Sequence, residues 1–270
     1  MLVEFHVFSA TDGLVILGTT SESTTLTEKE KDDIVRFVVS KNNFRMKIVV
    51  AVITNNTLEA IERSVKYEKM GADYLLLITP FYNKTNAYGL INHFKLIAES
   101  VNIPIILYNV PSRSGMNIDV DTLKILKQIP NIVGIKECSK DIDHIIKVSN
   151  ICDHYFHLYC GNDELGYLFL SLGATGIINV YGNLEPQLMK DIINVYEINP
   201  FLARRFFNDF YELLTNVFIE VNPIPIKTLM NYIGMDVGGC RLPLYTMREE
   251  NYLNLITLYD IKNYYHKRIW

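Results

Sequence analysis

Residues 48–78, IVVAVITNNTLEAIERSVKYEKMGADYLLLI, decide the fold. The stretch opens and closes on short apolar runs, 48–53 and 74–78, which are typical of buried strands in a parallel sheet. Between them, residues 57–70 carry apolar side chains at helical spacing and stop at Gly71, a residue suited to ending a helix. A strand, a helix and another strand in this order predict two parallel strands joined by a crossover helix.

The same alternation continues on both sides of this stretch. Seven apolar runs predict strands at residues 13–17, 48–53, 74–78, 104–108, 132–135, 156–159 and 176–180. Helical spacing lies between them, and the first helix is predicted to open on a capping box of Thr27 and Glu30. Seven such units are one fewer than a closed barrel of eight needs. We therefore predict an α/β fold, a TIM (β/α)8-type barrel that lacks its first strand.

The pattern changes after residue 180. Helices are predicted at residues 185–197, 201–219, 224–233 and 247–266, with no strand between them. We expect residues 1–184 to hold the barrel units and residues 185–270 to form a C-terminal helical region.

Composition excludes several classes of function. Hydrophobic residues make up 49% of the 270 residues, which is enough to bury a large core. The net charge of -4 gives no basic surface for nucleic acid, and no uncharged apolar run is long enough to predict a membrane span. The four cysteines form no CxxC pair, and the first six residues lack the layout of a secretory signal, so we expect a cytoplasmic protein with reduced thiols.

Lys136 is the sharpest candidate for catalysis. It follows residues 131–135 (NIVGI), a run that should be buried, at the carboxyl end of a predicted strand, where α/β barrels place their active sites. Lysine is rarely buried without a partner or a function, and a desolvated amine can attack a ketone to form a Schiff base. The alternatives are that Lys136 reaches the rim of the barrel or pairs with Glu137.

Three more polar residues follow predicted strands. Tyr108 is a candidate for proton transfer, with Thr19 as a link in a chain of hydroxyl groups, although a core tyrosine is the alternative. Arg113 follows a Pro-Ser turn, where a guanidinium suits a carboxylate or a surface ion pair.

No metal or nucleotide site is predicted. His154 and His157 are three residues apart but span a loop and the start of a strand, which is poor geometry for a metal. The chain has no GxGxxG, Walker or HExxH motif, so we expect neither a metal nor a bound cofactor.

Three segments in one order and spacing resemble a single family. They are residues 18–22 (GTTSE), 108–115 (YNVPSRSG) and 134–137 (GIKE). Residues 222–227 (NPIPIK) and 241–244 (RLPL) extend the likeness into the helical region. The chain resembles the dihydrodipicolinate synthase (4-hydroxy-tetrahydrodipicolinate synthase) family of the pyruvate-dependent class I aldolase superfamily.

The resemblance implies catalytic roles for four residues. Lys136 would form a covalent Schiff base with pyruvate, and no other cofactor would be needed. Tyr108 would be the proton shuttle, linked through Thr19 to Tyr82 of a neighbouring subunit.

It also implies how the substrates bind. Thr20 would hold the carboxylate of pyruvate, and Arg113 that of L-aspartate 4-semialdehyde. The main chain at Ile178 and the loop at Gly161 would face the substrates. The product would feed diaminopimelate and lysine biosynthesis, and the family's usual assembly is a homotetramer, a dimer of dimers.

Two other functions stay open. One is an N-acetylneuraminate lyase-like or other 2-keto acid aldolase, although the Thr19-Thr20 pair and Arg113 favour the synthase. The other is a truncated, non-catalytic remnant, because a first strand and about two helical turns of the family pattern are missing before Leu2.

Several positions depart from the family pattern. Ser21 replaces a glycine, which predicts backbone strain, and Val52 and Ile53 are bulky enough to crowd a strand end beside the pocket or the dimer interface. Glu28 and Lys31 replace the histidines of lysine-sensitive enzymes, so feedback inhibition is not expected.

Overall fold

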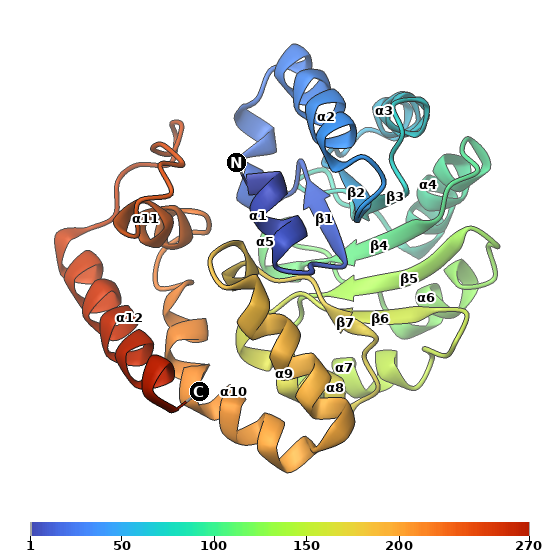
Figure 1. Ribbon diagram of the computed structural model, residues 1–270. Helices are drawn as coiled ribbons and strands as arrows, with labels where there is room; N and C mark the ends of the chain where they lie inside the picture. Colours follow the sequence, from blue (N-terminus) through green and yellow to red (C-terminus); the bar gives the residue numbers. More distant parts are fainter. Residues whose placement is uncertain (1, 270) are drawn as a thin grey trace.

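A single parallel sheet forms the centre of the molecule (Figure 1). The computed structural model describes the backbone of residues 2–269 and the side chains of residues 2–262. Strands that follow one another in sequence are neighbours in the sheet, and each pair is parallel. The strands are β1 (Gly13–Ile16), β2 (Lys47–Val52), β3 (Tyr74–Ile78), β4 (Ile105–Asn109), β5 (Ile132–Glu137), β6 (His157–Cys160) and β7 (Gly176–Ile177). All seven predicted strands are confirmed.

Helices return the chain between the strands and cover the outer face of the sheet (Figure 1). They are α2 (Glu28–Asn42), α3 (Thr57–Lys69), α4 (Ala87–Glu99), α6 (Val120–Leu126), α7 (Ile142–Ser149) and α8 (Gly166–Ser171), with the one-turn α5 (Pro111–Ser114) after β4. The capping box at the start of α2 is confirmed, because Thr27 accepts from the Glu30 amide and Glu30 accepts from the Thr27 amide. Between β6 and β7 the chain forms a 3-10 turn, η3 (Asp163–Leu165), that leads directly into α8.

Alternation along the strands divides the core into two layers. Outward side chains such as Val50, Leu75 and Leu107 pack against the helices. Inward side chains form a smaller cluster, of which Ala51, Tyr108 and Cys138 are members. A residue one position further along a strand therefore faces the other layer, which fixes the direction of each site residue.

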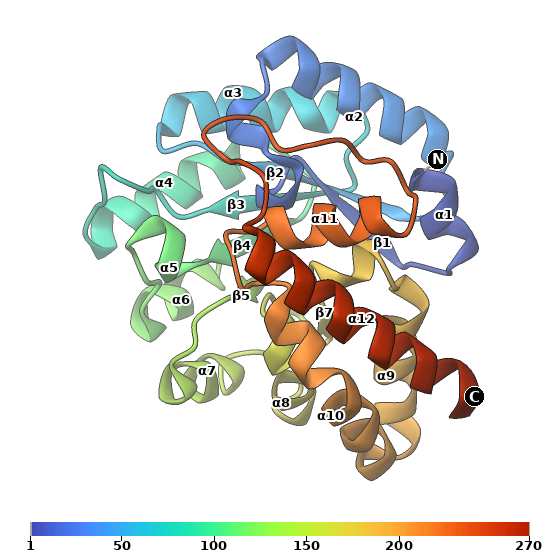
Figure 2. The ribbon, with the colours of Figure 1, turned by 90° about the vertical axis from the view of Figure 1, so that its left-hand side faces the viewer.

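The helices after β7 build a core of their own. They are α9 (Pro186–Ile198), α10 (Pro200–Asn216), α11 (Ile224–Tyr232) and α12 (Glu249–Ile269). Phe210 and Leu229 pack in this second core. Figure 2 shows α11 and α12 lying across one side of the molecule, with α10 behind them. No helix described is long and apolar enough to cross a membrane.

The sheet is curled but open along one line. Among the described residues, β1 pairs with β2 alone and β7 with β6 alone. A cavity of about 170 Å³ lies between these two edges and is lined by Leu14 from one side and Ile177 from the other. Helix α1 (Leu2–Phe8) lies beside β1 (Figure 1).

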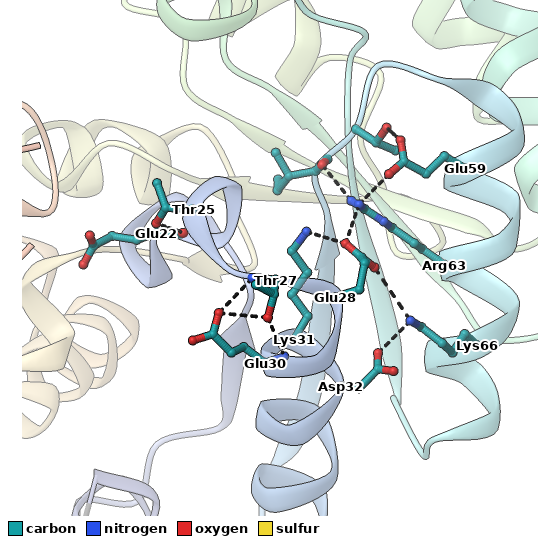
Figure 3. A network of polar contacts seen from close by, with 12 residues as sticks. Glu22, Thr25, Thr27, Glu28, Glu30, Lys31, Asp32, Glu59, Arg63 and Lys66 are labelled. Atoms are coloured by element: carbon teal, nitrogen blue, oxygen red, sulfur yellow. Dashed lines mark hydrogen bonds and ion pairs between the residues drawn. The ribbon is translucent and has the colours of Figure 1, made fainter. Parts of the chain in front are cut away.

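A network of ion pairs joins α2 to α3 (Figure 3). The Glu28 carboxylate lies 2.7 Å from the Lys31 ammonium and 2.8 Å from the Arg63 guanidinium. Arg63 also reaches Glu59, and Lys66 pairs with Asp32 at 2.6 Å. Glu28 and Lys31, which differ from the family pattern, therefore take part in a contact between α2 and α3 in which opposite charges pair with each other.

Candidate active site

A cavity of about 720 Å³ lies at the carboxyl ends of the strands. Seven of the eight residues predicted for the site line it, and Tyr82 is the exception. They are Thr19, Thr20, Tyr108, Arg113, Lys136, Gly161 and Ile178. The structure therefore brings together residues that are up to 159 positions apart in the chain, as counted between Thr19 and Ile178.

Lys136 and Tyr108 lie next to each other in the wall of this cavity. They are direct partners in the parallel ladder of β5 and β4, and both side chains face inward. The Lys136 Nζ lies 4.8 Å from the centroid of the Tyr108 ring, within the range of a cation–π contact. Glu137 faces the opposite layer, so the alternative of a Lys136–Glu137 pair is wrong.

Two side chains, Thr19 and Cys138, lie close enough to the Tyr108 hydroxyl to affect its pKa. Thr19 lies in η1 (Thr19–Ser21), the turn that follows β1, and Cys138 follows β5. Burial is the main reason that the pKa of Tyr108 is raised well above its usual value. The phenol is therefore protonated at neutral pH, which suits a group that donates a proton.

A second polar cluster braces the same strands from outside. Glu137 is fully buried and accepts two bonds from the Asn109 amide, at 3.0 and 2.8 Å. It also accepts from the Ser139 amide at 2.6 Å and lies 3.3 Å from His144 Nε2. Hydrogen bonding to Glu137 raises the pKa of His144, although burial opposes it. Asn117 completes the cluster through Asn109 Nδ2 at 2.6 Å.

Thr20 and Arg113, two groups that can bind carboxylates, both contact Asn222 in the wall of the cavity. Asn222, between α10 and α11, donates from Nδ2 to the Thr20 hydroxyl at 2.9 Å. The Arg113 guanidinium donates to the main-chain oxygen of Asn222 at 3.4 Å. The Oδ1 atom of Asn222 is buried and has no protein partner in the part of the chain that the structure describes. The helical region thus completes a cavity built mainly by the sheet.

Gly161 lies where no side chain would fit. A Cβ atom there would come within 2.1 Å of Cys138 Sγ and 2.8 Å of Lys136 Cε. Two residues on, the buried Asp163 accepts from the Val180 and Tyr181 amides, at 3.0 and 2.6 Å, and so fixes the turn after β7. Burial raises the pKa of Asp163 to about 6.

Tyr82 lies outside the cavity of its own chain. Its side chain is 92% exposed, and its backbone takes a left-handed conformation at φ 68°. Asn55 Nδ2 donates to the Phe81 carbonyl and Asn83 Nδ2 to the Asn55 carbonyl, each at 3.0 Å. The loop is therefore held with Tyr82 directed outward.

The strain predicted at Ser21 is not found there, and Val52 and Ile53 do not crowd the cavity. Ser21 is not among the residues with positive φ, whereas its neighbour Glu22 is, at 52°. Glu22 is stabilised there by an ion pair with Lys227 at 2.8 Å. Val52 packs outward among the helices and Ile53 against the inner layer, and neither lines the cavity.

Metal ligation has no geometric support in the described side chains. They include no group of three or more His, Cys, Asp and Glu residues that could hold a metal ion. His154 is exposed, and His157 Nδ1 lies 3.1 Å from the Thr175 hydroxyl.

Sequence reasoning missed several residues of the site. Cys138 and Asn222 line the cavity, and Glu137 and Asn109 brace its central pair. Glu137 could have been predicted from the alternation of the strand. It follows Lys136 in a buried run, so its carboxylate faces the opposite layer and needs a partner there. The contact of Asn222 with Thr20 joins positions 202 apart, and a single sequence holds no signal for it.

The fold and the site define a class: a parallel α/β barrel-type protein whose cavity, at the carboxyl ends of the strands, centres on a lysine. The profile of the dihydrodipicolinate synthetase family matches residues 1–261. The chain is 41% identical over 252 residues to 4-hydroxy-tetrahydrodipicolinate synthase of Acetivibrio thermocellus, covering 93% of this chain and 86% of that one. The chain belongs to the dihydrodipicolinate synthetase family.

Solved structures agree with this assignment. Dihydrodipicolinate synthase from Aquifex aeolicus superposes with a TM-score of 0.94 at 37% identity, covering 97% of this chain and 90% of that one. The chloride-inhibited enzyme of Acinetobacter baumannii, crystallised with pyruvate, gives a TM-score of 0.94 at 35% identity and the same coverage.

Proposed function

We propose that this protein is a 4-hydroxy-tetrahydrodipicolinate synthase, a lyase that condenses pyruvate with L-aspartate 4-semialdehyde. The observation that carries the proposal is the pairing of Lys136 with Tyr108 inside the main cavity, at 4.8 Å between Nζ and ring centroid. The family membership and the pyruvate complex of the Acinetobacter baumannii relative support the choice of substrate.

In the first half of the reaction, the Lys136 amine attacks the ketone carbon of pyruvate. The ketone oxygen leaves as water after two protonations, and an imine of Lys136 remains. The Tyr108 hydroxyl, which lies close to Thr19, supplies protons to the departing oxygen and takes up protons released by the amine nitrogen. Loss of a methyl proton then gives an enamine. The imine itself accepts the electron pair, so the reaction needs no added cofactor.

In the second half, the enamine carbon adds to the aldehyde carbon and the aldehyde oxygen takes up a proton. The amino group of the semialdehyde then attacks the imine carbon and displaces the Lys136 amine, which closes the ring. We propose that Thr20 holds the pyruvate carboxylate and Arg113 that of the semialdehyde, since both residues line the cavity. Gly161 and the main chain at Ile178 face the same space.

Reduction with borohydride in the presence of pyruvate tests the assignment. The expected adduct is a reduced pyruvyl group on Lys136, located by peptide mass analysis and absent in Lys136→Ala. A folded protein that forms no adduct would sink the proposal. Assays with L-aspartate 4-semialdehyde and with a sugar aldehyde distinguish a synthase from a sugar-acid aldolase, and a preference for the former should disappear in Arg113→Ala.

The proposed assembly is a homotetramer built from dimers in which Tyr82 of one subunit completes the site of another. Its support is the outward, left-handed placement of Tyr82 on a braced loop. Mixing Lys136→Ala protein with Tyr82→Ala protein tests it, because a mixed dimer has one intact site. Recovery of activity after mixing is expected, and none would contradict the shared site.

The wider setting follows from this reaction. We place the enzyme in the cytoplasm, in diaminopimelate and lysine biosynthesis. The sheet is proposed to be a (β/α)8-type barrel in which the line between β1 and β7 is the place of one further strand, with residues 185–270 as a C-terminal helical region. The separate core of α9–α12 supports this division.

A further inference from the structure

The second substrate of the proposed reaction brings a positive charge into the main cavity, and the roles given above assign no partner to it. L-aspartate 4-semialdehyde carries an amino group on the same carbon as the carboxylate that Arg113 is proposed to hold. At neutral pH this amine is protonated, and an ammonium group that leaves water without a partner is strongly disfavoured. Two carboxylates line the cavity and are candidates for that partner, Glu22 and Glu164.

The Glu22 carboxylate is engaged at both of its oxygens. Oε1 lies 2.8 Å from the Lys227 ammonium, and Oε2 accepts from the Arg241 amide at 2.7 Å. These contacts join the turn after β1 to α11 and to the loop that follows it. A substrate ammonium would have to displace a partner at either oxygen, so Glu22 is occupied by the fold.

The Glu164 carboxylate is engaged at one oxygen. The residue is only 9% exposed, and its Oε1 lies 2.6 Å from the Lys140 ammonium. The Lys140 side chain is 73% exposed, and water screens an ion pair with so exposed a lysine. Within the described part of the chain, Oε2 of Glu164 has no hydrogen-bond or ionic partner. A ligand in the cavity therefore meets a carboxylate with one acceptor atom still open.

The local fold places Glu164 close to the reactive lysine. Glu164 lies in η3, three residues after Gly161, and a Cβ atom on Gly161 would come within 2.8 Å of Lys136 Cε. Between them, Asn162 donates from Nδ2 to the Ser139 carbonyl at 3.0 Å, which ties the loop after β6 to the loop after β5. The short turn and this bond hold the carboxylate on the same wall as Lys136.

We propose that Glu164 determines substrate specificity by binding the ammonium group of L-aspartate 4-semialdehyde, and that Lys140 neutralises the carboxylate when this substrate is absent. The inference rests on the proposed function and names a further contact of the same site. Arg113 and Glu164 together recognise a carboxylate and an ammonium on one carbon, a combination that a sugar aldehyde lacks. The same contact keeps the amine that closes the ring on the side of the cavity that holds Lys136.

The experiment compares wild type with Glu164→Gln, which keeps the size of the side chain and removes its charge. KM for L-aspartate 4-semialdehyde is measured at saturating pyruvate, together with inhibition by succinate semialdehyde, which has a hydrogen atom in place of the amino group. Glu164→Gln should raise KM about tenfold, the effect of one lost charge-assisted hydrogen bond, and should change the inhibition constant by less than about twofold. Borohydride trapping of pyruvate on Lys136 should be unchanged.

Two control variants separate binding of the ammonium from support of the fold. Lys140→Ala removes the protein partner of Glu164 and keeps its carboxylate, so it should not raise KM for L-aspartate 4-semialdehyde. Asp143→Asn neutralises a carboxylate that pairs with Lys147 on α7, outside the cavity, and should leave both constants as they are in wild type.

Three results would overturn this inference while the proposed function stands. The first is a KM in Glu164→Gln within about twofold of wild type. The second is an equal weakening of succinate semialdehyde, because that loss would not involve the amino group. The third is an equal rise of KM in Lys140→Ala, which would mean that the ion pair itself shapes the cavity. Wild-type protein that traps no pyruvate would instead refute the proposed function, and this inference with it.

Discussion

Asn109 and Glu137 lie opposite each other in the ladder of β4 and β5, and the Asn109 amide donates to both carboxylate oxygens of Glu137. The residues immediately before them, Tyr108 and Lys136, are also partners but face the cavity. A polar pair on the outer face therefore sets the register of the reactive pair on the inner face. Since a slip of one residue would exchange the two faces, this contact protects the site directly.

Replacing Glu137 with glutamine should destabilise the protein by about 1–3 kcal/mol. The NH2 group of the glutamine would face one of the donors that Glu137 now accepts from, and that donor would be left without an acceptor. The Asn109 amide and the Ser139 amide both donate to Glu137, and glutamine offers a single carbonyl oxygen. Urea unfolding measures the change. Glu62→Gln, an exposed substitution on α3, is the control and should leave the midpoint in place.

The titration of His144 reports the same cluster. Its hydrogen bond to Glu137 is the main reason that its pKa is raised, with Asp141 and Asp119 adding charge and burial acting against them. A raised pKa in the folded state means that this pair stabilises the fold fully below pH ~6.5 and that the contribution is lost as the pH rises through the folded pKa.

NMR titration of the imidazole signals measures this effect. The pKa of His144 should fall in Glu137→Gln, because burial remains while the acceptor is lost. His93, whose pKa burial lowers to about 4, lies outside the cluster and should titrate identically in both proteins. An unchanged pKa of His144 would mean that the 3.3 Å contact with Glu137 carries no charge interaction.

Replacement of Gly161 by alanine should slow pyruvate trapping roughly 100-fold. The new Cβ would lie within 2.1 Å of Cys138 Sγ and 2.8 Å of Lys136 Cε, so Lys136 must move, and displacements of about 1 Å cost roughly 100-fold in rate. Borohydride trapping measures the loss. Gly176→Ala on β7, whose Cβ would meet Tyr159 at an ordinary 3.7 Å, should trap normally. Normal trapping by both variants would show that Lys136 is free to reposition.

The pattern of apolar residues was sufficient to predict the sheet, because each buried strand is marked in the sequence by its own short apolar run. The strand-end rule likewise predicted Lys136, Tyr108 and Arg113 as neighbours, since parallel strands gather their carboxyl ends. The family resemblance contributed Thr20 and Gly161, which composition and periodicity alone do not identify.

Other parts of the site have no local cause in the sequence. Asn222 reaches Thr20 through the packing of the helical region against the sheet, and Cys138 has the composition of an ordinary core residue. The expected strain at Ser21 was misplaced by one residue, because the left-handed position of the turn is Glu22 and an ion pair with Lys227 supports it. Such features depend on tertiary contacts that spacing does not encode.

Asn222→Ala should weaken pyruvate binding while leaving imine chemistry intact. The Asn222 side chain donates to the Thr20 hydroxyl, whereas Arg113 contacts only the Asn222 main chain, so alanine removes the first contact and keeps the second. We expect KM for pyruvate to rise about fivefold with little change in KM for the semialdehyde. Steady-state kinetics measure both constants, with Asn216→Ala on α10 as the control. Equal effects on both substrates would contradict the separate roles.

The open line of the sheet predicts uneven hydrogen exchange. Strand β1 is hydrogen-bonded to β2 alone and β7 to β6 alone, whereas β4 has a partner on each side. Backbone amides that face the line between β1 and β7 have no strand partner among the described residues, so they should exchange on opening events far smaller than global unfolding. Exchange followed by mass spectrometry should show faster uptake in peptides from β1 and β7 than in peptides from β4. Equal protection of all three strands would mean that this line is closed in solution, by a further strand or by a second molecule.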